Sequence, residues 1–117
     1  MFFDNPLFLI PFGSGLIFCV TGAIMYRFPP KKINSLYGYR TASSMKNKER
    51  WKFAQIYSAK QLITLGLVLS LCGLVGLIYK PTEEISTFLG LGLMILMVVL
   101  LVIKVENKLK EKFKNKV

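Results

Sequence analysis

Histidine is absent from this sequence of 117 residues, and cysteines and acidic residues are scarce. Without histidine, the chain lacks the most common metal ligand and general base. Cys19 and Cys72 each lie alone in an apolar segment, at depths that differ too much for a disulfide. Glu49 is the one acid near the central loop, and a single carboxylate supports no paired acid–base mechanism. The sequence therefore predicts no enzyme, no cofactor and no metal site.

Charged side chains are also absent from three long apolar segments, residues 7–26, 62–79 and 85–103. The hydrocarbon core of a bilayer is about 30 Å thick, so a helix rising about 1.5 Å per residue crosses it in about 20 residues. The segments have this length and are continuously apolar rather than alternating, which favours helices over strands. We therefore expect one all-α membrane domain over residues 1–117, with three transmembrane helices at about residues 6–27, 58–79 and 83–104.

The basic residues are unequally divided between the two sides of such a bundle, and the formal net charge is +10. Nine lysines and arginines lie between Tyr26 and Gln61 and six follow Ile103, whereas Lys80 is the only basic residue elsewhere. Positive charge near the ends of spans is retained in the cytoplasm. We therefore expect a multi-pass plasma-membrane protein with its N-terminus outside. The loop at residues 28–57 and the tail at residues 105–117 would be cytoplasmic.

Several residues suit the beginnings of the three helices. Asn5 is a suitable N-cap with Pro6 as the first helical residue, because proline needs no hydrogen-bond partner there. Ser43 or Ser44 is expected to cap the second helix, which would begin in the cytoplasm and run for about 35 residues to position 79. Thr82 is expected to cap the third helix, and two glutamates follow it where the helix dipole favours carboxylates.

The third helix is expected to continue beyond the membrane into the lysine-rich tail. Val105, Leu109 and Phe113 recur every four residues there. An apolar stripe of this kind is typical of a helix that lies on the bilayer surface or emerges from it. The sequence therefore predicts that the third helix extends into the tail, and both positions of this extension stay open.

Small residues recur at helical spacing on the first two apolar segments. They are Gly15, Cys19 and Gly22 on the first, and Gly66, Ser70 and Gly73 on the second. Stripes of small residues allow helix backbones to approach closely in lipid. We favour packing of the two spans against each other within one chain, and the alternative is a seam between two copies.

The loop between the first two spans is basic and contains interleaved aromatic residues. This composition could indicate a nucleic-acid surface. However, cytoplasmic flanks of spans attract lysine, arginine, tryptophan and tyrosine for lipid-facing reasons. Each basic side chain near an anionic leaflet gains about 1 kcal/mol. We therefore expect anionic lipids of the inner leaflet as partners of this loop, and no nucleic acid.

The stretch YGYRT at residues 37–41 is unusual for a loop that serves only as an anchor. Gly38 permits a backbone turn that other residues avoid. Arg40 offers a planar guanidinium suited to backbone carbonyls, carboxylates or phosphates. The tyrosines and Trp51 are amphipathic rings expected to set the depth of the loop at the interface. Two interpretations stay open, an ordered cap over the cytoplasmic end of the bundle pinned by Arg40, and a partner-binding face.

Residues 29–55, PPKKINSLYGYRTASSMKNKERWKFAQ, closely resemble the signature of the SdpI family, small integral membrane proteins of bacteria. The matching residues are Pro30, Ile33, Asn34, Tyr37, Gly38, Tyr39, Arg40, Thr41, Ser44, Met45, Lys46, Asn47, Glu49, Trp51 and Ala54. The family often has asparagine where this chain has Gln55, a change that keeps the amide. The founding member is longer, with additional spans, and this chain resembles its shared C-terminal region.

The resemblance implies an immunity function. The founding member protects its cell from a secreted killing peptide that collapses the membrane potential, and it draws a cytoplasmic repressor to the membrane when toxin is present. We therefore expect protection against a membrane-active peptide toxin, and a signalling role through a cytoplasmic repressor or regulator. The residues implied in partner binding or in ordering the motif are Tyr37, Gly38, Tyr39, Arg40, Thr41, Ser44, Met45, Asn47 and Trp51.

Two other functions are compatible with the same residues. The chain could be a membrane receptor or scaffold whose basic loop and tail recruit a cytoplasmic regulator. It could also be a lipid-binding accessory subunit of a larger membrane complex. A soluble acidic partner captured by the loop would favour the first, and copurification of stoichiometric partner spans would favour the second.

Overall fold

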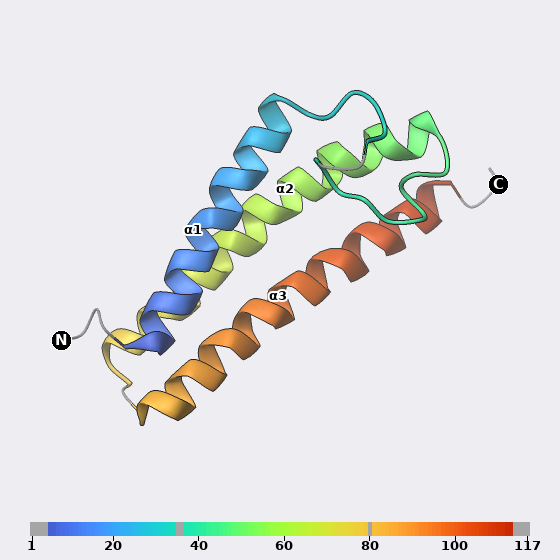
Figure 1. Ribbon diagram of the computed structural model, residues 1–117. Helices are drawn as coiled ribbons and strands as arrows, with labels where there is room; N and C mark the ends of the chain where they lie inside the picture. Colours follow the sequence, from blue (N-terminus) through green and yellow to red (C-terminus); the bar gives the residue numbers. More distant parts are fainter. Residues whose placement is uncertain (1–4, 35–36, 80, 114–117) are drawn as a thin grey trace.

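The computed structural model describes residues 5–34, 37–79 and 81–113. Within these residues the regular structure consists of helices: α1 (Pro6–Arg27), α2 (Lys48–Gly73), the 3₁₀ helix η2 (Leu74–Leu77) and α3 (Glu83–Lys112). α1 packs along α2, and α3 packs beside both of them (Figure 1). With α2 and η2 taken as one, three helices are long and apolar enough to cross a membrane. The predicted all-α membrane fold is confirmed.

The bundle is longer than the apolar part of a bilayer. Its longest dimension is 52 Å, whereas the hydrocarbon core is about 30 Å thick. α2 begins and α3 ends at the same end of the bundle, and the loop joining α1 to α2 folds over that end (Figure 1). This loop and the end of α3 therefore lie on one side of the membrane, as three spans require. That this side is the cytoplasm stays a prediction from the charge distribution.

The predicted caps of the first and third helices are confirmed. The Asn5 side-chain oxygen accepts a hydrogen bond from the Leu7 N–H at 3.2 Å, and Pro6 is the first residue of α1. The Thr82 hydroxyl oxygen accepts from the Ile85 N–H at 3.3 Å. Both side chains satisfy backbone donors that have no partner inside the helix.

The predicted start of the second helix is wrong. Its N-cap is Asn47, whose side-chain oxygen accepts from the Arg50 N–H at 2.8 Å, and α2 begins at Lys48. Ser44 is instead buried in the turn that precedes the helix, where its hydroxyl bonds with loop backbone. The helical segment also ends earlier than predicted, as a 3₁₀ turn at Leu77, so that it has 30 residues.

Asn5 also connects the start of α1 to the end of η2. Its side-chain nitrogen donates to the Gly76 carbonyl oxygen at 2.8 Å and to the Tyr79 carbonyl oxygen at 3.2 Å. Carbonyl groups at a helix C-terminus lack partners inside the helix, and lipid cannot supply them. One side chain therefore caps one helix and satisfies the end of another.

The small residues of α1 and α2 face each other within the chain. A Cβ atom added to Gly15 would lie 2.5 Å from the Gly66 carbonyl oxygen, and one added to Gly66 would lie 2.7 Å from the Gly15 carbonyl oxygen. At Gly22 a Cβ atom would lie 2.8 Å from the Ala59 carbonyl oxygen. These distances are too short for a side chain, so the backbones are in direct contact. The interpretation of the two stripes as intrachain packing is confirmed.

α3 continues to Lys112, so the predicted extension of the third helix into the tail is confirmed. Its apolar stripe contacts protein, so this part of the helix emerges from the apolar segment and does not lie on the bilayer surface. Val105 and Leu109 are completely buried, and Phe113 is 5% exposed. They form one cluster with Ala54 of α2. The reason is that α2 extends beyond the apolar segment at the same end as α3, which gives the stripe a helix to pack against. A second cluster, Leu65, Leu69 and Met97, joins the same two helices farther along.

The outer surface of the helices is apolar, as expected of a bundle in lipid. Large side chains such as Ile17, Leu71 and Phe88 are more than half exposed. An apolar surface of this extent is unusual in a water-soluble monomer.

Both cysteines are free, in agreement with the absence of a predicted disulfide.

The α1–α2 contact yields a first prediction. Gly15→Ala should lower the free energy of unfolding by about 1–3 kcal/mol, because the added methyl group forces apart two backbones in contact. Gly13→Ala is the matched control, since a Cβ atom at Gly13 meets nothing within 4 Å. Denaturation of the two variants in detergent, followed by circular dichroism, measures the difference. Equal stability of both variants would contradict the close packing.

Candidate functional site

The predicted site residues gather in one structure at the end of the bundle. We call residues 28–47 the signature loop; its residues 35–36 lie outside the described part of the chain. The loop lies against the first turns of α2 and the last turns of α3 (Figure 1).

The Gln55 side chain holds the centre of the signature loop. Its Nε2 donates to the Tyr39 carbonyl oxygen at 2.8 Å, and its Oε1 accepts from the Tyr39 N–H at 2.7 Å. Gln55 is completely buried. The preceding Gly38 has a φ of 107°, and a Cβ atom there would meet Gln55 Oε1 and lie 2.7 Å from Pro30. The predicted need for glycine at this turn is confirmed, on both conformational and steric grounds.

Two hydroxyl groups connect the signature loop to α3 through a single carboxylate. The Tyr39 hydroxyl donates to Glu106 Oε2 at 2.7 Å, and the Thr41 hydroxyl donates to the same oxygen at 2.9 Å. Burial of the phenol, together with the adjacent Glu106 carboxylate, raises the pKa of Tyr39 well above its usual value. Tyr39 is therefore a neutral hydrogen-bond donor at physiological pH. Hydrogen bonds to a charged acceptor are among the stronger ones in proteins.

A tight turn follows Thr41 and contains Ser44 and Met45. The Ser44 hydroxyl oxygen accepts from the Thr41 N–H at 2.9 Å, and the Ser44 N–H donates to the Thr41 hydroxyl oxygen at 3.1 Å. The Met45 N–H donates to the Thr41 carbonyl oxygen at 3.0 Å. Ser44 has no exposed surface. These two residues order the loop, and Ser44 is not available to a partner.

Trp51 lies in the protein interior. Its indole N–H donates to the Pro30 carbonyl oxygen at 2.7 Å, and its side chain is 1% exposed. The prediction that Trp51 sets the depth of the loop at the lipid interface is therefore wrong. The tryptophan instead fixes the segment that follows α1 against the first turn of α2, because a buried indole N–H requires an acceptor.

Arg40 and Tyr37 hold the exposed side of the signature loop together. Arg40 Nε donates to the Asn34 carbonyl oxygen at 2.7 Å, and the Tyr37 N–H donates to the Asn34 side-chain oxygen at 2.7 Å. The Tyr37 hydroxyl donates to the Phe28 carbonyl oxygen at 2.8 Å. Arg40 thus bonds a backbone carbonyl as predicted, but it is exposed and lies at the edge of the loop rather than at its centre.

Arg50 orders the loop as well, although it is not among the residues that the sequence predicts for the site. Its guanidinium bonds the Ser43 carbonyl oxygen at 2.8 Å and the Ser43 hydroxyl at 2.6 Å. It also lies 5.4 Å from the centre of the Phe113 ring, and the residue is 7% exposed. A planar cation with several donors suits this position between a carbonyl and an aromatic ring. Asn47, the cap of α2, orients the same turn.

Glu106 is also absent from the predicted site residues, although the sequence contains a feature that indicates its role. It lies beside Val105 and three residues before Leu109, so it borders the apolar stripe of the tail. An acid next to a stripe that becomes buried is a candidate acceptor for polar groups of the covering segment. No comparable signal distinguishes Arg50 from the lysines around it.

A small cavity lies beneath the tyrosine turn. It has a volume of about 280 Å³ and is bounded by the Tyr37–Gly38–Tyr39 backbone together with Met25, Leu62 and Leu101. Residues of all three helices therefore meet the motif there. The cavity is mostly apolar, which suits the side chain of a hydrophobic ligand rather than a charged substrate.

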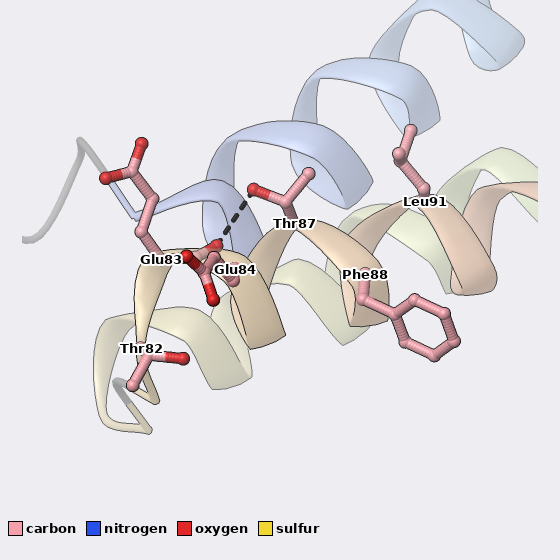
Figure 2. A pocket seen from close by; sticks show the side chains of 6 residues that line it. All are labelled: Thr82, Glu83, Glu84, Thr87, Phe88 and Leu91. Atoms are coloured by element: carbon pink, nitrogen blue, oxygen red, sulfur yellow. Dashed lines mark hydrogen bonds between the residues drawn. The ribbon is translucent and has the colours of Figure 1, made fainter.

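Another hollow lies at the opposite end of the bundle, at the start of α3. It measures about 810 Å³ and is lined by successive turns of α3 itself, including Glu83, Glu84 and Phe88 (Figure 2). The Thr87 hydroxyl donates to the Glu83 carbonyl oxygen at 2.9 Å. The two carboxylates occupy the first turn, where the helix dipole stabilises negative charge. Their position is explained without a ligand. Among the described residues, no group of histidine, cysteine and acidic side chains could hold a metal.

Comparisons with known proteins identify relatives of this structure. A model of the SdpI/YfhL protein family matches residues 31–105, which include most of the signature loop, α2 and the part of α3 up to Val105. The uncharacterized protein YfhL of Bacillus subtilis (strain 168) is 40% identical over 90 residues, which cover 77% of this chain and 69% of that protein. No solved structure matches the chain.

The Glu106 contacts yield a second prediction. Glu106→Ala should lower the free energy of unfolding by about 2 kcal/mol, because the Tyr39 and Thr41 hydroxyls lose a charged acceptor. Glu111→Ala is the matched control on the same helix, since its side chain is 74% exposed and reaches Lys108 only at 4.0 Å. That control should change stability by less than about 0.5 kcal/mol. Chemical denaturation in detergent measures both values.

Gly38 yields a third prediction. Gly38→Ala should destabilise the loop by about 1–3 kcal/mol, since alanine disfavours positive φ and its methyl group displaces Gln55. Trypsin should then cleave the signature loop at Arg40 and Lys46 faster than in the unchanged protein. Gly92→Ala serves as the control, because a Cβ atom at Gly92 meets nothing within 4 Å. Unchanged cleavage in Gly38→Ala would show that Gln55 does not hold this turn.

Proposed function

The chain belongs to the SdpI/YfhL protein family, and from this membership we propose that it protects the cell against a secreted, membrane-active peptide toxin. The observation that carries the proposal is the family match over residues 31–105, which includes the motif on which the resemblance to immunity proteins rests. In this proposal the protein lies in the plasma membrane with its N-terminus outside. The toxin is the partner, and the protein binds it without catalysing a reaction.

The composition of the spans supports protection by binding. Residues 7–26, 62–79 and 85–103 contain no charged side chain. A proton relay or an ion-coupled export pathway usually requires such residues inside the membrane. A stoichiometric mechanism needs only a surface for the toxin and a rigid bundle that does not open. The contacts of the signature loop with α2 and α3 supply that rigidity.

The cavity beneath the tyrosine turn supports a location for this binding. It is bounded by all three helices and by the motif, and its lining is mostly apolar. A membrane-active peptide is rich in apolar side chains, because it must partition into lipid. We propose that one such side chain enters the cavity and that the Tyr37–Tyr39 turn covers it.

A receptor or scaffold that recruits a cytoplasmic regulator is the second candidate function. The observation that favours it is the exposed basic side of the loop, where Arg40 and Lys46 have ammonium or guanidinium nitrogens without a described partner. An acidic regulator would be attracted by such a surface. The two candidates can coexist if toxin binding changes the conformation of the loop.

Expression in a sensitive host provides the fourth prediction. Cells that produce the protein should survive a membrane-active peptide toxin that kills cells without it, and a potential-sensitive dye should show that their membrane potential is kept. Arg40→Ala should weaken protection by about tenfold in the protective dose, because Arg40 holds Asn34 and the tyrosine turn. Lys46→Ala is the matched control, an exposed cation of the same loop.

Three results would distinguish between the proposals. Equal killing with and without the protein, across a broad panel of peptide toxins, would contradict immunity. Full protection by a well-expressed Arg40→Ala variant would contradict the role of the motif but not the immunity itself. Capture of an acidic cytoplasmic protein that requires Arg40 and Lys46, without any protection, would favour the receptor.

A further inference from the structure

A basic pocket lies between the start of the signature loop and the first turn of α2. It has a volume of about 510 Å³ and is lined by Lys31, Lys32, Ile33, Lys48 and Trp51. Two of the lysines directly follow the prolines that end α1, and Lys48 is the first residue of α2. Cations separated by 16 positions in the sequence are therefore brought together by the fold.

The pocket is built by the same hydrogen bonds that order the loop. The Trp51 indole fixes Pro30, the residue before Lys31, at 2.7 Å. The Asn34 side-chain nitrogen donates to the Lys32 carbonyl oxygen at 3.0 Å, and Arg40 holds the Asn34 carbonyl oxygen. The backbone that carries Lys31 and Lys32 is thus fixed on both sides. The motif therefore positions the backbone of Lys31 and Lys32, and the helix α2 positions that of Lys48.

No described acid neutralises this pocket. Its lining contains no carboxylate, and none of the three ammonium groups forms an ion pair or a hydrogen bond with a described residue. Glu49, next to Lys48 in the sequence, lines a different pocket together with Phe53 and Phe113. Three like charges around one pocket, without a counterion among the described residues, repel one another. Such an arrangement is favourable when an anion binds between them.

The position along the bundle indicates where that anion lies. α1 has 22 residues, which correspond to about 33 Å at about 1.5 Å per residue and so to the full hydrocarbon core. Lys31 comes four residues after Arg27, the last residue of α1. The pocket therefore lies at the level of the lipid headgroups. The nearest abundant anions there are phospholipid phosphates.

We propose that this pocket binds the phosphate headgroup of an anionic phospholipid. The three lysines contact the phosphate, and Ile33 borders the glycerol region. The inference goes beyond the proposed function, because it requires no toxin and no cytoplasmic partner. It also makes Arg40 a positioning residue for the lipid site, since Arg40 acts on Lys32 through Asn34.

Titration of the full chain with phosphatidylglycerol in neutral-detergent micelles tests this site. Trp51 is the only tryptophan in the chain, so its emission reports on the pocket, and mass spectrometry of the intact complex counts retained lipids. The unchanged protein should retain one phosphatidylglycerol in preference to phosphatidylcholine. The triple variant Lys31→Gln, Lys32→Gln and Lys48→Gln should bind phosphatidylglycerol at least about tenfold more weakly.

The matched control removes three other exposed lysines on the same side, through Lys46→Gln, Lys104→Gln and Lys110→Gln. It has the same net charge as the pocket variant. Because its three lysines do not line the pocket, it should bind phosphatidylglycerol within about twofold of the unchanged protein. A tenfold weakening corresponds to about 1.4 kcal/mol. If both triple variants lost the same affinity for phosphatidylglycerol, the lipid would be attracted by the overall positive charge and not by the pocket, which would overturn the proposal. Equal binding of phosphatidylcholine would overturn it as well.

Two further measurements are needed to interpret the lipid titration. Inorganic phosphate at millimolar concentration should not displace the lipid; displacement would identify a site for free phosphate and overturn the lipid assignment. Circular dichroism of each variant establishes that its helices are intact. If the triple variant were unfolded, Lys32→Gln alone would be used, and an affinity equal to that of the unchanged protein would overturn the proposal. These measurements do not depend on toxin protection, so either proposal can fail separately.

Discussion

The pair of hydrogen bonds between the Gln55 amide and the Tyr39 backbone is the contact on which the rest of the loop depends. A loop segment outside a helix or sheet has a backbone donor and a backbone acceptor that both require partners. The Gln55 side-chain amide supplies both partners, an acceptor for the Tyr39 N–H and a donor for the Tyr39 carbonyl oxygen. Because Gln55 is completely buried, water cannot replace it. Its position sets the backbone on either side, including the positive φ of Gly38.

From this fixed point the loop reaches all three helices. The Tyr39 ring is directed to Glu106 of α3, and the adjacent turn carries Thr41 to the same carboxylate. Trp51 holds the end of α1 through Pro30. The hydrophobic effect does not drive helices together inside lipid, so close packing and hydrogen bonds must hold the helices of this bundle together. α1 and α2 have backbone contact through glycines, whereas α3 is joined at this end by polar bonds and the tail cluster.

What the sequence could predict follows from the range of each interaction. The three spans, the caps Asn5 and Thr82 and the need for Gly38 depend on residues close in sequence, and all are confirmed. The predicted start of α2 is wrong because Ser44 bonds within its own turn, to Thr41 and Tyr39, and Asn47 caps the helix instead. Burial of Trp51 likewise depends on Pro30, which is 21 positions away. Bonds such as that from Tyr39 to Glu106 join residues 67 positions apart, and no local rule indicates them.

The different roles of arginine and lysine explain why the loop is both ordered and strongly basic. Arg50 is buried because its planar guanidinium can satisfy a carbonyl, a hydroxyl and an aromatic ring at once. A lysine ammonium has no such fork and keeps its hydration more strongly, so the lysines of the loop remain outside. The guanidinium groups thus order the motif, while the ammonium groups supply its charge. Since the ordered motif in turn positions Lys31 and Lys32, its structural bonds determine where that charge can meet an anion.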